Sequence, residues 1–260
     1  MPFAERDVPI FYRDTGAGPK TLLFCHGAGG NSASWWQQIP VFAQRYRCLA
    51  LDHRGFGLSR CSPEAFRVDA FADDAVAVLD AAGVEQAHFV CQSMGGWTGV
   101  QIALRHPQRA RSLVLADTIG GIALPAGIDS MGRMDERARA AGAASPALAA
   151  DYPRRDPAGA FLYETLSTFN DVGFGNRDAL RKLFDPTVLI PLADAALLAL
   201  PTLIVASLHD LIWPPEVLRE LATHLPHARV AEVEAGHSAY FENPQAFNRV
   251  LADFLADVDR

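Results

Sequence analysis

Short, almost uninterrupted apolar segments recur along this 260-residue chain, and helical patterns separate them. Strands that are apolar on both sides belong to a parallel sheet whose two faces are covered by helices. A continued alternation of such strands with helices is the pattern of an α/β domain. We therefore expect an α/β fold with strands at 21–25, 48–52, 88–91, 112–117, 202–207 and 229–234.

Helical patterns fill the intervals between these segments. The segment 69–83 ends at Gly83, and glycine commonly stops a helix. A second helix follows Ser93, and a third is expected over 215–225. The amphipathic segment PQAFNRVLADFLADV predicts a last helix at 244–258.

The alternation breaks between about Ile119 and Pro191, where helical patches such as RMDERARAAGAA replace strand patterns. Such a segment is either a helical cap packed on the sheet or a long disordered loop. Disordered segments are poor in aromatic residues, and this one contains Phe161, Leu162, Tyr163, Leu166, Phe169 and Phe174. We therefore predict a core formed by 1–118 and 192–260, and a helical cap or lid formed by 119–191.

Composition and charge limit the kinds of partner. The formal net charge of −7 argues against nucleic acid and against an anionic membrane surface. No apolar run approaches the roughly 20 residues that span a bilayer, and the N-terminal residues lack the pattern of a secretory signal. The four cysteines have no metal-ligand spacing and are expected to be reduced. We expect a cytoplasmic protein with a small-molecule substrate; the oligomeric state is not indicated.

The segment CQSMGG, residues 91–96, places a lone serine between a predicted strand and a predicted helix. A G-x-S-x-G nucleophile elbow exposes a serine Oγ on such a tight turn. Gly95 and Gly96 fit this motif, and Cys91 replaces its first glycine with another small residue. Ser93 as a helix N-cap is the alternative, but it leaves unexplained two early glycines that cost about 1 kcal/mol each in a helix.

A nucleophilic serine requires a base, and the base requires a carboxylate that orients it. In a parallel sheet these groups follow later strands at their carboxyl ends. Asp210 follows the strand 202–207, and His237 follows the strand 229–234. Taken singly, Asp210 also suits a helix cap and His237 a loop. The order Ser, Asp, His behind successive strands favours a catalytic triad.

An oxyanion hole requires backbone N–H groups aimed at the developing negative charge. One donor is expected at Met94, where a helix N-terminus favours an anion. The other is expected in the loop HGAGGNSASWW, with Ala28 as the candidate and Gly29 beside it. A glycine-rich loop also occurs in phosphate sites, but this one matches neither G-x-x-x-x-G-K-[ST] nor G-x-G-x-x-G.

Four stretches in this order resemble the α/β-hydrolase superfamily, in particular its serine-nucleophile esterases and lactonases: HGAGG at 26–30, DHRGFGLS at 52–59, CQSMGG at 91–96, and HDLIWP with AGHSAYFENP at 209–214 and 235–244. The resemblance implies a mostly parallel eight-stranded sheet with flanking helices and a helical cap inserted after the sixth strand.

The same resemblance implies that Ser93, Asp210 and His237 form the triad. Some members of the superfamily place the acid after the sixth strand, where Asp117 lies; we expect Asp210, at the commoner position. His26 is expected to hold the geometry of its loop. Members that open epoxides or displace halide use aspartate as the nucleophile, so Ser93 excludes those activities.

We expect a serine hydrolase that cleaves a small to medium, largely apolar carboxylic ester, thioester or lactone through an acyl-enzyme on Ser93. No metal or organic cofactor is expected, since the sequence has no H-E-x-x-H motif and no Cys/His cluster. Trp97 is expected in the core. The candidates for the substrate pocket, besides Met94, are Gly29, Phe161, Tyr163, Phe174 and Trp213.

Two other functions remain open at this point. A carbon–carbon bond hydrolase or a perhydrolase would use the same triad with a different cap and pocket. A ligand receptor with vestigial hydrolase activity is the alternative from another class, because fold alone does not fix function. A complete set of nucleophile, base, acid and oxyanion loop favours catalysis, since a receptor has no need of all four.

Overall fold

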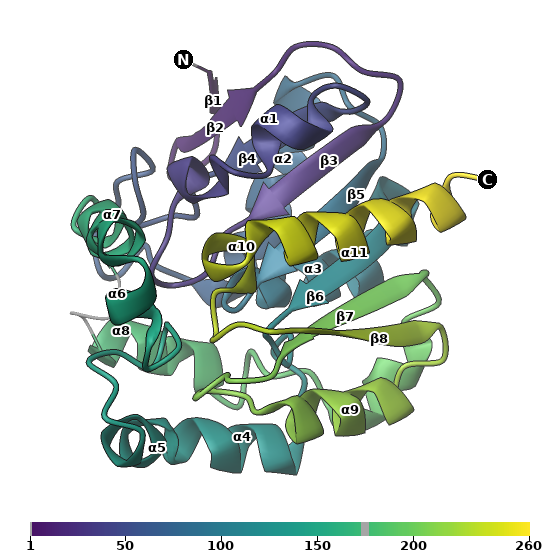
Figure 1. Cartoon of the computed structure of the whole chain (residues 1–260). Coiled ribbons are helices and arrows are strands. Elements are labelled where there is room, and N and C mark those ends of the chain that lie inside the picture. Colours follow the sequence, from purple (N-terminus) through teal and green to yellow (C-terminus); the bar gives the residue numbers. More distant parts are fainter. Residues whose placement is uncertain (1, 173–176) are drawn as a thin grey trace.

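The computed structural model describes residues 2–172 and 177–260. These residues form a sheet of eight strands in the order β1-β2-β4-β3-β5-β6-β7-β8 (Figure 1). Strand β2 runs against both of its neighbours, and the other neighbouring pairs are parallel. The predicted fold, a mostly parallel eight-stranded sheet with flanking helices, is confirmed. The strands are β1 Phe3–Ala4, β2 Ile10–Asp14, β3 Thr21–Cys25, β4 Arg47–Leu51, β5 Ala87–Gln92, β6 Ala110–Ala116, β7 Thr202–Ser207 and β8 Ala228–Val233.

The six strands expected from the sequence correspond to β3 through β8, with bounds that agree to within two residues. The sequence analysis missed β1 and β2. Both lie at the antiparallel edge of the sheet, and β1 is only two residues long. The end of β2 is exposed and polar, so it lacks the continuous apolar pattern of the central strands.

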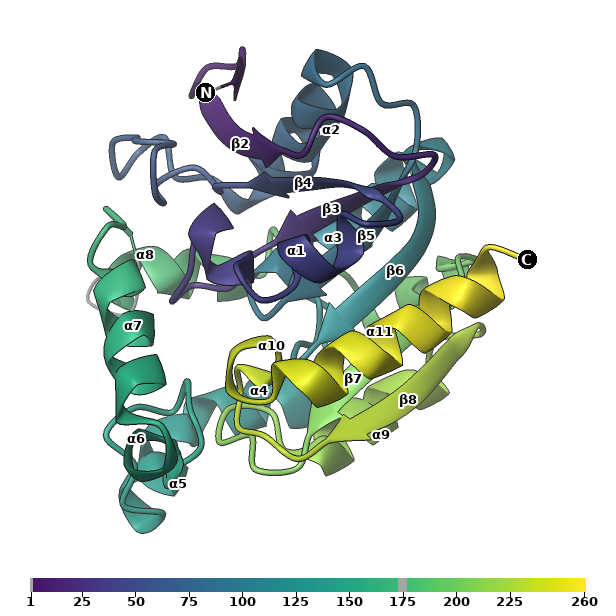
Figure 2. The ribbon, with the colours of Figure 1, turned by 45° about the horizontal axis from the view of Figure 1, so that its top comes forward.

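Helices cover both faces of the sheet. In Figures 1 and 2, α1 and α11 lie on one face, and α2, α3 and α9 lie on the other. Two apolar clusters fill these layers, one containing Phe42 and Phe247, the other Phe71, Trp97 and Leu218. The flanking helices are α1 Ile39–Phe42, α2 Phe71–Ala81, α3 Gly95–Arg105, α9 Pro215–Thr223, α10 Ala239–Glu242 and α11 Pro244–Val258, with short 3-10 helices η1 Ser32–Trp35, η2 Val68–Ala70, η3 Pro107–Arg109 and η5 Leu192–Leu197.

Helices also make up the segment between β6 and β7, which we call the helical insertion (residues 119–191). Its described elements are α4 Pro125–Gly132, α5 Met134–Ala140, α6 Tyr152–Arg155, α7 Pro157–Ser167, α8 Arg177–Arg181 and the 3-10 helix η4 Lys182–Phe184. A bridge between Ile122 and Ile190 joins the start of the insertion to its end. The division of the chain into a core and a separate cap domain stays a prediction.

The parallel strands bring their carboxyl ends to one edge of the sheet, and the helices of the insertion lie beside that edge (Figure 2). Residues that follow β3, β5, β7 and β8 therefore meet there, although they are far apart in the sequence. In the described part of the chain, no helix is both long enough and apolar enough to cross a membrane.

Candidate active site

Ser93 lies on the turn between β5 and α3, with a φ of +49°. Residues with a side chain seldom adopt this left-handed conformation, so the turn is strained. A Cβ added to Gly95 would lie 2.2 Å from the carbonyl oxygen of Cys25, and one added to Gly96 would lie 2.5 Å from Oγ1 of Thr118. The two glycines therefore allow this turn to pack closely against the neighbouring strand ends.

Cys91 occupies the position at which the elbow motif has its first glycine, and its side chain is fully buried. A Cβ added to Gly99 of α3 would lie 2.7 Å from the Sγ of Cys91. Gly99 thus provides the space that the thiol fills, which explains how the turn forms without the glycine. Burial raises the pKa of the Cys91 thiol, so the group remains neutral.

Ser93, His237 and Asp210 are joined by hydrogen bonds. His237 Nε2 lies 2.9 Å from Ser93 Oγ, and His237 Nδ1 lies 2.9 Å from Asp210 Oδ2. Because a carboxylate only accepts, Nδ1–H donates to Asp210 and Nε2 is left to accept the serine proton. All three residues are buried, with exposed fractions of 8% for Ser93, 3% for Asp210 and 2% for His237.

The loop after β7 holds Asp210 in this orientation. The Asp210 Oδ1 atom accepts hydrogen bonds from the backbone N–H groups of Ile212 at 2.7 Å and Trp213 at 3.1 Å. The Trp213 ring packs on the His237 ring with 5.7 Å between centroids, and its Nε1 donates to the carbonyl oxygen of Gly127 in α4. Asp210 is therefore fixed by its own loop, and that loop is bound to the insertion.

The alternative acid, Asp117, follows β6 and lies fully buried, with a φ of +49°. Its Oδ1 accepts a hydrogen bond from the backbone N–H of Ser207 at 2.9 Å, and its Oδ2 has no hydrogen-bond partner among the described residues. Burial and the nearby Asp210 raise the pKa of Asp117 well above its ordinary value. His237 donates its Nδ1–H to Asp210 and not to Asp117.

The two expected oxyanion positions, Ala28 and Met94, line one cavity together with Ser93. His26 stabilises the loop that carries Ala28, because its Nδ1–H donates to Gly27 O at 2.8 Å and its Nε2 accepts from the His53 N–H at 2.9 Å. Burial lowers the pKa of His26 to about 4, so the ring is neutral. These contacts give His26 a structural role, as the sequence predicts. The N–H groups of Ala28 and Met94 as oxyanion donors stay a prediction.

The cavity at Ser93 has a volume of about 370 Å³. Met131, Met134 and residues 144–146 of the insertion form one side of it. Aromatic side chains form much of the remaining wall, namely Trp97, Phe184 and Trp213, so the lining is largely apolar. Methionine sulfurs and aromatic rings pack favourably together, so this combination of side chains suits one cavity. Such a lining suits an apolar group on the substrate.

Three of the predicted pocket residues lie elsewhere. Phe161, in α7, is 71% exposed and does not line the cavity, so that prediction was wrong. Tyr163 is buried beside Phe241, with ring centroids 5.2 Å apart, and its hydroxyl lies 3.2 Å from Ser238 Oγ, so it packs between α7 and α10 rather than in the cavity. Gly29 is buried in the turn next to Ala28 but does not line the cavity.

Phe174 lies outside the described residues. Trp213 and Met94 do line the cavity.

The sequence analysis missed several cavity residues. Trp97 is fully buried, as predicted, yet it also lines the cavity. Its position in the first turn of the helix that begins directly after Ser93 is the signal that could have identified it. Met131, Met134 and Phe184 come from a region without a recognisable motif, so nothing in the sequence indicated them.

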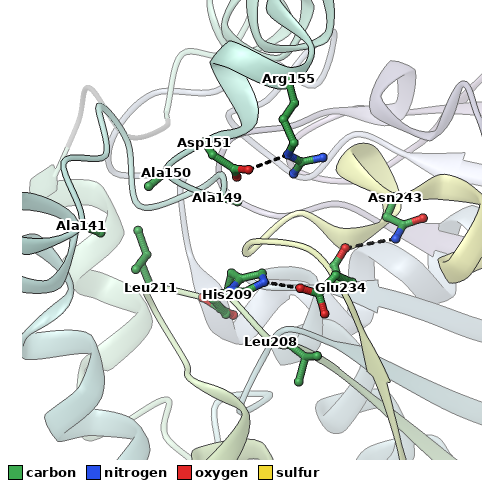
Figure 3. Close-up of a pocket in the computed structure, with 11 residues that line it drawn as sticks. Ala141, Ala149, Ala150, Asp151, Arg155, Leu208, His209, Leu211, Glu234 and Asn243 are labelled. Atoms are coloured by element: carbon green, nitrogen blue, oxygen red, sulfur yellow. Dashed lines mark hydrogen bonds and ion pairs between the residues drawn. The ribbon is translucent and has the colours of Figure 1, made fainter.

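A larger cleft of about 740 Å³ opens on the other side of the Asp210 loop, between the insertion and the end of β8 (Figure 3). Its polar side chains pair with one another: Arg155 with Asp151 at 2.9 Å, and His209 with Glu234. Ser93 does not line this cleft, so the smaller cavity is the candidate substrate site. Within the described ranges, no three His, Cys, Asp or Glu residues are grouped as they are around a metal ion.

Comparison with known proteins gave matches over most of the chain. A family model described as alpha/beta hydrolase fold matches residues 20–161, more than half of the chain. The "Putative carbamate hydrolase RutD" of Azorhizobium caulinodans is 31% identical over 276 residues, with both chains covered completely. The 3-oxoadipate enol-lactonase 2 of Acinetobacter baylyi is 26% identical, covering 95% of this chain and 92% of the relative.

Among solved structures, Est816, described as an N-acyl homoserine lactone degrading enzyme, superimposes with a TM-score of 0.81. It is 28% identical, and the match covers 97% of this chain and 100% of Est816. The match to Est816 therefore extends well beyond the residues that match the family model.

Proposed function

This chain belongs to the α/β-hydrolase-fold family, and we propose that it is a serine hydrolase that cleaves a small to medium, largely apolar carboxylic ester, thioester or lactone. The observation that carries the proposal is the continuous hydrogen-bonded series Ser93–His237–Asp210 at the base of an apolar cavity. The names of relatives support hydrolysis in general, and two of the three compared proteins are named for action on lactones.

The reaction begins when Ser93 Oγ attacks the carbonyl carbon of the substrate. His237 Nε2 accepts the serine proton, and Asp210 stabilises the imidazolium that forms. The backbone N–H groups of Ala28 and Met94 are the proposed donors to the tetrahedral oxyanion; losing one such donor typically costs about 3–4 kcal/mol of transition-state stabilisation.

The tetrahedral intermediate then collapses. The bond to the leaving alcohol or thiol breaks, His237 gives its proton to that group, and the acyl group stays on Ser93. In the second half, His237 accepts a proton from water as the water attacks the acyl-enzyme. The acid is released, and the proton returns to Ser93 Oγ. For a lactone, the leaving alcohol belongs to the same molecule as the acyl group, so the product released from Ser93 is a single hydroxy acid.

The experiment that tests the proposal is steady-state hydrolysis of p-nitrophenyl acetate, butyrate and octanoate, with an N-acyl homoserine lactone as a further substrate. We expect repeated turnover by the wild-type protein and its loss in Ser93→Ala, which removes only the nucleophilic oxygen. Circular dichroism of both proteins establishes that they are folded. Hydrolysis by Ser93→Ala at the wild-type rate, or folded wild-type protein inert toward all four substrates, would contradict the proposal.

A further inference from the structure

Glu242 is the last residue of α10 and is 8% exposed. Its carboxylate contacts the loop that carries His237. One of its oxygens accepts a hydrogen bond from the backbone N–H of Gly236 at 3.2 Å, and the other accepts from the N–H of Ser238 at 3.4 Å. A single buried side chain thus binds the residues immediately before and after His237.

The same carboxylate also binds the helical insertion. The backbone N–H of Ala149 lies 3.1 Å and 3.3 Å from the two Glu242 oxygens. A Cβ added to Gly236 would lie 2.1 Å from the Ala149 nitrogen, so the loop and the insertion touch backbone to backbone. Ser238 Oγ adds a hydrogen bond to the carbonyl oxygen of Ala147 at 2.9 Å.

Glu242 is bound mainly by these N–H groups rather than by a cation. Arg155 lies beside it, with 3.9 Å between Nη2 and the nearer carboxylate oxygen. The Arg155 guanidinium makes its close contact with Asp151, as Figure 3 shows at the wall of the larger cleft. A buried carboxylate that accepts several backbone N–H bonds defines the position of those backbone segments, because both of its oxygens are needed as acceptors.

The carbonyl oxygen of His237 is bound by a different side chain. The side-chain amide of Gln92, the residue before Ser93, donates to the carbonyl oxygen of His237 at 2.9 Å. Glu242 and Gln92 both bind the peptide group between His237 and Ser238, and Glu242 also binds the peptide group between Ala235 and Gly236. The 2.9 Å separation of Nε2 from Ser93 Oγ depends on that backbone position.

We propose that Glu242 is a positioning residue for His237, which it holds by binding the loop 236–238 to residues 147–149 of the insertion. The inference rests on the function proposed above. The insertion then does more than cover the substrate, because residues 144–146 line the cavity and the next residues of the same segment secure the base. A misplacement of about 1 Å at a catalytic group can lower the rate about a hundredfold.

The test compares Glu242→Gln and Glu242→Asp with the wild-type protein in p-nitrophenyl butyrate hydrolysis. Glutamine has nearly the same shape, but its amide NH₂ would face N–H donors in place of an acceptor oxygen. Aspartate keeps both acceptors on a shorter side chain, and it carries the test if the glutamine variant does not fold. We expect kcat per folded molecule to fall about ten- to a hundredfold. KM should change less than about twofold, since Glu242 does not line the cavity.

Asp74→Asn is the matched control. Asp74 is also a buried carboxylate, with an exposed fraction of 1%, but it binds Arg54 at 2.7 Å and does not contact the His237 loop. We expect this variant to lower the melting temperature and leave kcat per folded molecule unchanged. The proposal is overturned if kcat of the folded Glu242 variants stays within twofold of wild type, if the loss lies in KM, or if Asp74→Asn loses kcat equally. Failure of the proposed function is a different result, namely wild-type protein that hydrolyses no substrate.

Discussion

Replacement of Asp210 by asparagine tests the triad most directly, because the structure determines which way the new amide points. The Asp210 Oδ1 atom accepts two backbone N–H groups, those of Ile212 and Trp213. In Asp210→Asn these donors would keep the amide oxygen and exclude the NH₂ group. The NH₂ group must then face His237 Nδ1, where Asp210 Oδ2 now lies at 2.9 Å.

This arrangement forces the imidazole into the wrong tautomer. Nδ1 becomes the acceptor, so the ring proton moves to Nε2 and points at Ser93 Oγ, and Nε2 can no longer take the serine proton. The same exchange in a serine protease triad lowers kcat by about 10⁴, which corresponds to about 5 kcal/mol in activation free energy. We expect a loss of this size here, because the base fails in the same way.

The assay is kcat for p-nitrophenyl butyrate, measured for Asp210→Asn and for Asp117→Asn at pH 7. Both variants exchange a buried aspartate for asparagine, but only Asp210 binds His237. We expect the large loss only in Asp210→Asn, with little change in melting temperature because both backbone contacts persist. Retention of more than about a tenth of the wild-type kcat by Asp210→Asn, or an equal loss in Asp117→Asn, would refute this reasoning.

Two further predictions concern stability and the pocket. Burial raises the folded-state pKa of Asp117. Asp117 therefore costs the folded state no stability below the unfolded pKa of about 4, and the cost grows as pH rises from that value up to the folded pKa. Asparagine tolerates the positive φ at this position, so Asp117→Asn should become more stable relative to wild type as pH increases. Urea denaturation at pH 5 and pH 8 measures the free energy of unfolding of both proteins. A difference between them that does not change with pH would contradict the prediction. Phe184 lies in the cavity wall, so Phe184→Ala should lower kcat/KM for the octanoate ester about tenfold relative to the acetate ester. Phe161→Ser, at an exposed position, should leave kcat/KM for both esters unchanged. Equal effects of the two variants would argue against this pocket.

The central strands were predictable because each must be apolar on both faces. Almost every residue is buried in four of them, β3, β5, β6 and β7. A strand buried on both faces requires a nearly continuous run of apolar residues, which can be recognised in the sequence. The antiparallel edge escaped prediction for the opposite reason: β1 and the polar end of β2 make too few buried contacts to impose a pattern.

The candidate site also contains residues that the sequence predicted and residues that it did not. Ser93, Asp210 and His237 follow strands at fixed short distances, so the position of each strand located its polar group. Residues of the helical insertion do not follow a predicted strand, so their distance from Ser93 could not be inferred from the sequence. The distance of Phe161 from the cavity and the contact of Tyr163 with Ser238 depend on how α7 packs, which helical periodicity alone does not determine.

The placement of Asp210 and His237 after the last two strands affects when activity can arise during synthesis. By the proposed mechanism, a nascent chain that ends before β7 has Ser93 but lacks both Asp210 and His237, so it is inactive. Strands β7 and β8 join the sheet by parallel pairing between distant segments, which is intrinsically slow. Ester hydrolysis regained during refolding would therefore report the pairing of β7 and β8 with the sheet, and a chain truncated before β7 would be inactive even if the rest of the sheet had formed.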